Sequence, residues 1–104
     1  MSEYKIDFNS IEWESSLKGV KFKKYISGNK QVRFVEYTKD FVEPNWCSKG
    51  YIGYVVEGEI EIDFNGNITS YKSGDNIFIP AGEEHKHKAK IISNYAKVFL
   101  VEDI

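Results

Sequence analysis

The segment that decides the fold runs from Gly74 to His85 and reads GDNIFIPAGEEH. Its centre, Ile77–Ile79, is a short apolar run with the length and composition typical of a β-strand. Gly74 precedes this run, and Pro80 and Gly82 follow it. Glycine permits positive φ, while proline fixes φ and has no amide donor. These residues therefore predict a strand between two sharp turns, with His85 just beyond the second turn.

The rest of the chain also has the periodicity of short strands. The segments 20–25 and 31–38 alternate around the turn sequence SGNK and predict a hairpin, in which Arg33, Val35 and Tyr37 share one side. Strict alternation over Ile60–Phe64 leads into the tight-turn sequence NGN. Further strands are predicted at Tyr51–Val56, His85–Lys90 and Tyr95–Val101. We therefore predict an all-β sandwich or barrel over residues 20–104, preceded by an arm or edge strand at 1–19.

Composition narrows the classes of function. The 104 residues include 41% hydrophobic and 15% aromatic residues, which predicts one globular domain. The formal net charge is −2 with both signs interspersed, so we expect no nucleic-acid partner. The chain has one cysteine, Cys47, with no secretory leader and no long apolar run. We therefore expect a reducing, cytoplasmic setting and no membrane partner.

The order of Gly74, Pro80, Gly82 and His85 resembles the second signature motif of the cupin superfamily, with five, one and two residues between them. From Phe41 onwards the sequence is similar to that of short, mostly uncharacterised single-domain bacterial cupins. The resemblance implies a double-stranded β-helix, or jelly-roll barrel, with His85 as a metal ligand in its mouth. It also implies a homodimer, since dimers are common among cupins.

The first cupin motif, two histidines followed by a glutamate and a glycine, is altered here. Gly58 matches the closing glycine. Counting back from it places Tyr51 at the glutamate position, and the histidine positions fall on Cys47 and Asn45 or, with a longer spacing, on Trp46 and Pro44. An unchanged cupin metal centre is therefore not implied.

An altered metal site is still a hypothesis. Thiolate and imidazole are ligand types that suit transition metals, so Cys47, His85 and His87 could hold one Zn, Ni, Mn or Fe ion. Alternation along one strand would place both imidazole rings on the same face. The competing interpretations are a histidine without a ligand and a cysteine acting as a small buried hydrophobe. Candidates to contact a bound molecule are Tyr51, Asn45 and Trp46, although Tyr51 could simply fill volume.

Three functions follow as hypotheses. The first is a small cupin that binds a small polar molecule in its barrel, with or without a metal ion. The second is a metal-dependent isomerase, epimerase or dioxygenase, which rests on fold analogy alone. The third is a degenerate barrel that acts through its outer surface. For the arm, Trp13 could anchor a partner subunit or cover the bottom of its own barrel.

Overall fold

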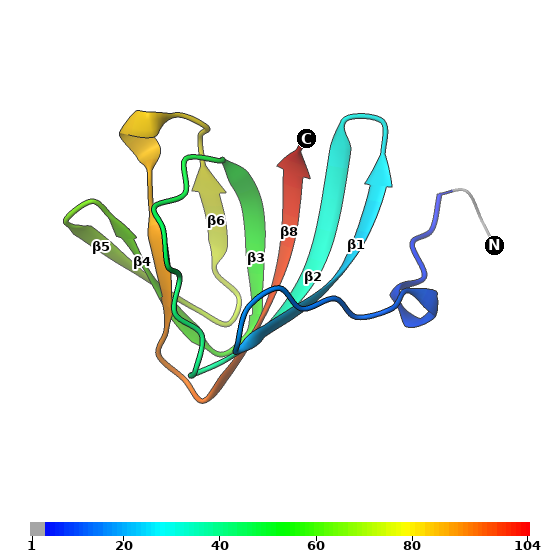
Figure 1. The fold of residues 1–104 in the computed structure, drawn as a ribbon, viewed down its shortest axis with the longest axis horizontal. Helices are drawn as coiled ribbons and strands as arrows, with labels where there is room; N and C mark the ends of the chain where they lie inside the picture. The colour runs from blue at the N-terminus through cyan, green and yellow to red at the C-terminus, as the bar shows by residue number, and fades with distance from the viewer. Residues whose placement is uncertain (1–3) are drawn as a thin grey trace.

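The computed structural model describes residues 4–104, which fold into two antiparallel sheets that face each other (Figure 1). The larger sheet has the strand order β1-β2-β8-β3-β6, and the smaller sheet has the order β5-β4-β7. The strands are β1 (Val20–Ser27), β2 (Lys30–Thr38), β3 (Tyr51–Glu57), β4 (Glu59–Phe64), β5 (Asn67–Lys72), β6 (Asn76–Ile79), β7 (Lys88–Ile91) and β8 (Tyr95–Asp103). The predicted all-β jelly roll is confirmed.

The core fills the space between the sheets. Its most deeply buried side chains are branched aliphatic residues from both sheets, namely Val35, Val55, Ile62, Ile77 and Val98. Alternate residues on the same strands face outwards, as period-2 geometry requires. Burying these side chains on one face of each sheet fixes the register, because a slip of one residue would turn the apolar set to solvent.

The predicted strand over His85–Lys90 is wrong in its first half. Residues Glu83–His85 form a 3-10 turn, η2, and β7 begins only at Lys88. The amide of His85 donates to the carbonyl of Gly82 at 3.0 Å, which closes this turn. The alternation therefore starts after the turn, and His85 and His87 do not lie on one strand.

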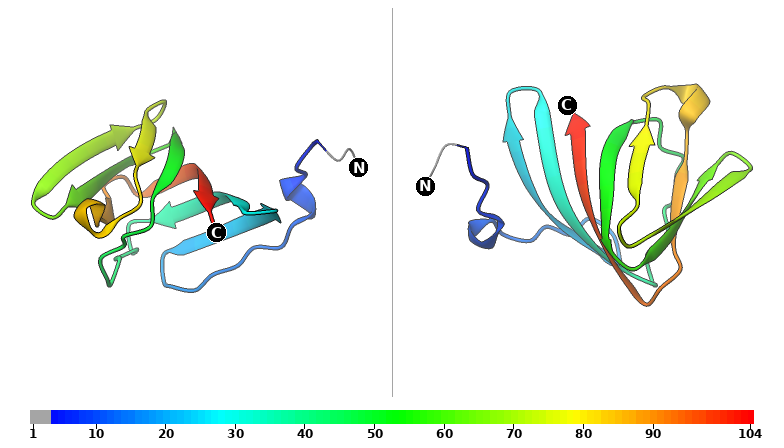
Figure 2. Two further views of the ribbon diagram at one scale, coloured as in Figure 1. Left: turned by 90° about the horizontal axis from the view of Figure 1, so that it is seen from above. Right: turned by 180° about the vertical axis from the view of Figure 1, so that it is seen from behind.

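The N-terminal segment lies against the larger sheet on the side of β1 (Figure 2). It contains a 3-10 turn, η1 (Phe8–Ser10), and Glu14 pairs with Phe22 of β1 in an antiparallel bridge. The ring of Trp13 lies 6.3 Å from that of Phe34 on β2. Trp13 therefore packs on its own sheet, not at the bottom of the barrel; its contact with a partner subunit stays a prediction. Residues 1–3 of the predicted arm lie outside the described residues.

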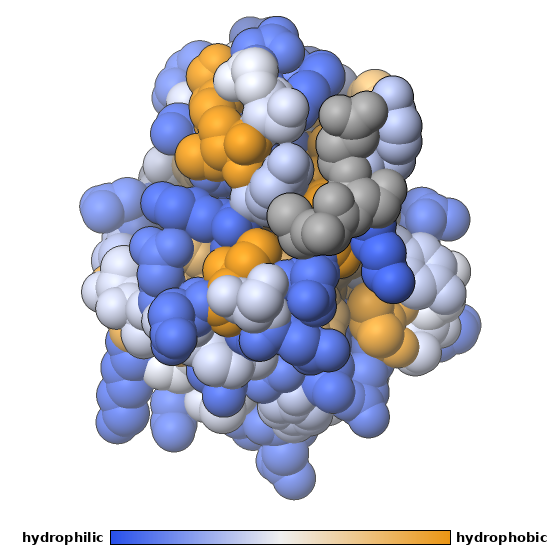
Figure 3. Space-filling view, turned by 90° about the vertical axis from the view of Figure 1, so that its right-hand side faces the viewer, coloured by the Kyte–Doolittle hydropathy of each residue, from blue (hydrophilic) through white to orange (hydrophobic). Residues whose placement is uncertain are grey.

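The surface on this side of the molecule is mostly hydrophilic, and its hydrophobic residues form small separate patches (Figure 3). Within residues 4–104, no helix has the length and hydrophobicity needed to cross a membrane.

Candidate functional site

A cavity of about 320 Å³ lies between the two sheets. The larger sheet contributes Arg33, Val35 and Tyr37 from β2 and Glu102 from β8. The opposite wall comes from the connection between β2 and β3, from β7 and from the residue before β7, and includes Glu43, Cys47, His87 and Ala89. The cavity thus combines aromatic and aliphatic walls with a few charged and hydroxyl groups, as small-molecule sites do.

Cys47 and His87 face each other in this wall. Each donates its amide hydrogen to the carbonyl of the other, both at 2.9 Å. Such a doubly bonded antiparallel pair places both side chains on the same face of the sheet. The shorter motif spacing, which placed Cys47 in the first motif, therefore fits the structure better than the spacing that selects Trp46.

The imidazole of His87 is held tightly. Its side chain is almost fully buried, and its ring centroid lies 5.8 Å from that of Tyr51 and 5.9 Å from that of Phe64. Nδ1 lies 3.1 Å from the carbonyl oxygen of His85. Because a carbonyl oxygen can only accept, this contact assigns a proton to Nδ1.

Three residues predicted to belong to the site do not line this cavity: His85, Asn45 and Trp46. The side chain of His85 is 41% exposed, with Nε2 3.7 Å from Oε1 of the neighbouring Glu84. Asn45 is exposed, and the ring of Trp46 lies under the ammonium of Lys88 at 4.9 Å. Of the predicted residues, the structure brings together Cys47, His87 and Tyr51.

Glu43 was not predicted to be a site residue. Its Oε1 accepts a hydrogen bond from the amide of Ala89 at 2.8 Å, which ties the irregular connection to β7. Burial raises the pKa of this carboxyl group, and the Ala89 amide, His87 and Lys88 oppose the shift. No periodic pattern marks Glu43 in the sequence, because it lies in the segment without regular alternation.

Two tyrosines give the cavity neutral hydroxyl groups. Burial raises the pKa of the Tyr37 phenol to about 12, with Arg33 opposing the shift and Glu43 adding to it. Burial also raises the pKa of Tyr51 far above its usual value. Both phenols therefore stay protonated at neutral pH and can donate hydrogen bonds to a ligand. Alternation with Val35 could have identified Tyr37 from the sequence.

Arg33 and Glu102 form an ion pair across β2 and β8. The guanidinium donates from Nε and Nη2 to the two carboxylate oxygens, with Nη2 at 3.1 Å from Oε2. Gln31 donates to the same carboxylate at 3.3 Å. The pair is bidentate, so each charge on this side of the cavity is largely balanced within the protein.

The residues present do not fit the predicted metal ion. Across the described chain, no three His, Cys, Asp or Glu side chains are grouped closely enough to hold one. Cys47 and His87 share a wall, but His85 lies apart from them on η2. Metal binding by Cys47, His85 and His87 stays a prediction that this geometry does not support.

The fold resembles several solved structures. An RmlC-like cupin from Shewanella frigidimarina has a TM-score of 0.75 at 20% identity, over 98% of this chain and 91% of the other. The polyketide cyclase RemF from Streptomyces resistomycificus has a TM-score of 0.80 at 16% identity, over 98% and 80%. KdgF from Halomonas sp. has a TM-score of 0.70 at 19% identity, over 92% and 91%. These low identities show a shared fold and not a shared reaction.

The sequence comparison points to the same fold. Residues 48–99 match the family described as a cupin domain. No curated protein matches the chain.

Proposed function

The chain belongs to the cupin family, and on that premise we propose that the cavity between its sheets binds one small polar molecule. The observation that carries the proposal is the cavity of about 320 Å³ that holds Tyr37, Glu43, Tyr51 and His87 together. Small-molecule sites begin at roughly 300 Å³ and pair apolar walls with a few polar groups, so this cavity suits a small ligand.

The predicted metal ion is not part of this proposal, because its three ligands do not converge. A metal-dependent isomerase, epimerase or dioxygenase stays a hypothesis to which we assign no residue. A degenerate barrel is less favoured, because an inactive interior would be expected to replace its charged groups with apolar ones. A reducing, cytoplasmic setting is part of the proposal and is supported by the free thiol of Cys47.

Blocking the cavity is expected to weaken ligand binding. Ala89 pairs with the fully buried Ile62, so its side chain faces inwards, whereas Lys90 pairs with Glu61 on the outer face. We expect Ala89→Leu to weaken ligand binding by at least about tenfold through steric overlap. Lys90→Leu adds a similar side chain to the same strand and should leave binding unchanged.

The measurement is an NMR titration with a panel of polyols, hydroxy acids and small amines. Binding in the cavity should shift the amide signals of Cys47, Tyr51 and His87. The proposal fails if no compound shifts these signals, or if Ala89→Leu binds as well as the unchanged protein while keeping its fold.

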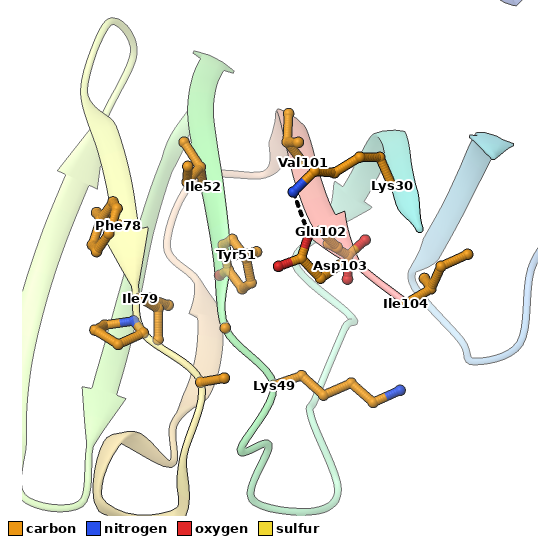
Figure 4. Close-up of a pocket in the computed structure, with 13 residues that line it drawn as sticks. Lys30, Lys49, Tyr51, Ile52, Phe78, Ile79, Val101, Glu102, Asp103 and Ile104 are labelled. Carbon is orange, nitrogen blue, oxygen red and sulfur yellow. Dashed lines mark hydrogen bonds and ion pairs between the residues drawn. The ribbon is translucent and has the colours of Figure 1, made fainter. Parts of the chain in front are cut away.

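We also propose that the protein forms a homodimer through the outer face of the larger sheet. Phe78 on β6 and Ile52 on β3 are cross-strand partners that lie side by side, and they are 73% and 53% exposed (Figure 4). They line a surface pocket of about 430 Å³ whose other residues include the Lys30–Asp103 ion pair. A twofold contact joins a patch to itself, so an apolar centre with both charges at its rim suits a second copy.

This dimer can be tested by sedimentation over a wide range of protein concentrations. A stable interface of this kind buries about 800 Å² of surface on each partner. A charged side chain at its apolar centre should therefore weaken the dimer. We expect a dimer for the unchanged protein and a monomer for Phe78→Lys. Ile68→Lys, which charges another exposed apolar position on β5, should remain dimeric. A monomer at all concentrations, or a dimer that survives Phe78→Lys, contradicts the proposal.

A further inference from the structure

The carboxyl group of Glu43 faces the cavity with few partners in the protein. One oxygen, Oε1, accepts from the amide of Ala89. Within residues 4–104, no ion pair includes Glu43. A partly buried carboxylate without a cation is unfavourable, so this group would gain from a positively charged partner.

No cation of the described chain lies within ion-pair distance of the Glu43 carboxylate. Arg33, which lines the same cavity, makes its bidentate ion pair with Glu102. The ammonium of Lys88 lies over the ring of Trp46, and the exposed Lys49 also lines the cavity. Of the two carboxylates that line the cavity, Glu102 is paired with Arg33 and Glu43 has no ion-pair partner.

Aromatic rings line the same cavity as this carboxylate. Tyr37 and Phe41 lie with their centroids 5.0 Å apart at an interplanar angle of 57°, and Tyr51 lines the same space. The faces of such rings attract cations, and their surfaces also suit the carbon part of a ligand. Carboxylate and rings together make a setting that favours an organic cation over a neutral or anionic molecule of the same size.

We propose that the ligand of this cavity is a small protonated amine, with its ammonium group on Glu43 and its carbon skeleton among the aromatic rings. This inference rests on the proposed binding function and gives its ligand a chemical class. The charge of the ammonium provides the ion-pair partner that Glu43 lacks, and its N–H groups donate to the carboxylate.

A matched pair of probes tests the inference on the full chain. Benzylamine and benzyl alcohol have nearly the same size and shape, but only the amine is charged at neutral pH. We expect the amine to bind at least about tenfold more tightly by NMR titration. In Glu43→Gln, which keeps an oxygen for the Ala89 amide, the two probes should bind equally.

Glu61→Gln is the control, because it removes the same charge from the outer face of β4. It should leave the preference for the amine unchanged. If Glu61→Gln loses this preference as fully as Glu43→Gln does, the assignment to Glu43 is overturned. Equal binding of both probes to the unchanged protein would overturn the amine inference while leaving the binding function intact. If no compound in the wider panel binds, both the amine inference and the proposed binding function are overturned. The comparison of probes on the unchanged protein holds even if Glu43→Gln does not fold.

Discussion

His87→Ala is expected to lower the free energy of unfolding by about 3 kcal/mol, whereas His85→Ala should change it by less than about 0.5 kcal/mol. The reason is burial: the side chain of His87 is almost fully enclosed, and that of His85 is 41% exposed. Truncating His87 removes a ring packed against Tyr51 and Phe64 and leaves a void between them. Urea unfolding followed by circular dichroism measures both variants.

The contrast between the two histidines also tests their assignment. The second motif singles out His85, yet in the structure the neighbouring turn places His87 in the cavity wall. If the two substitutions lower the free energy of unfolding by the same amount, or if His85→Ala lowers it more, the placement of these rings is wrong. His87→Gln, which keeps a polar side chain of similar length, should recover part of the lost stability.

The fold was predictable because its signals are local and periodic. The hairpin of β1 and β2, the strict alternation of β4 and the turn after it depend on neighbouring residues, and each lies where the sequence predicts it. The alternation of β2 even placed Arg33, Val35 and Tyr37 on one side, and all three line the cavity. The all-β class therefore follows from hydrophobic period and turn chemistry, whereas the jelly-roll topology was implied by the resemblance of the second motif.

The site was only partly predictable, because its positions depend on contacts between distant segments. Glu43 lies in an irregular connection that two bridges hold in place, one from Val42 to Lys90 on β7 and one from Cys47 to His87 just before β7. No local pattern encodes such bridges. The 3-10 turn at Glu83–His85 takes His85 out of the strand, so only one of the two histidines predicted to share a face lines the cavity.

Gly58→Ala is expected to have the largest effect on stability, at least about 3 kcal/mol, because the site is both crowded and conformationally restricted. Gly58 joins β3 to β4 with φ of +91°, a value that side chains rarely adopt. A Cβ atom here would lie 2.4 Å from the carbonyl oxygen of Tyr95 and 2.8 Å from Cα of Ala96. Both are backbone atoms of β8, so relief requires the central strand of the larger sheet to shift.

Gly66→Ala separates the two contributions, because Gly66 has φ of +111° but a Cβ atom there would have no neighbouring atom within 4 Å. This variant should show only the conformational cost, about 1–2 kcal/mol. The difference in urea midpoint between the two variants, at equal slope, then measures the crowding against β8. Equal midpoints would mean that β3 and β8 are not packed as closely as the structure has them. A Gly58→Ala chain that is unfolded without denaturant, beside a folded Gly66→Ala chain, agrees with close packing of the β3–β4 connection against β8.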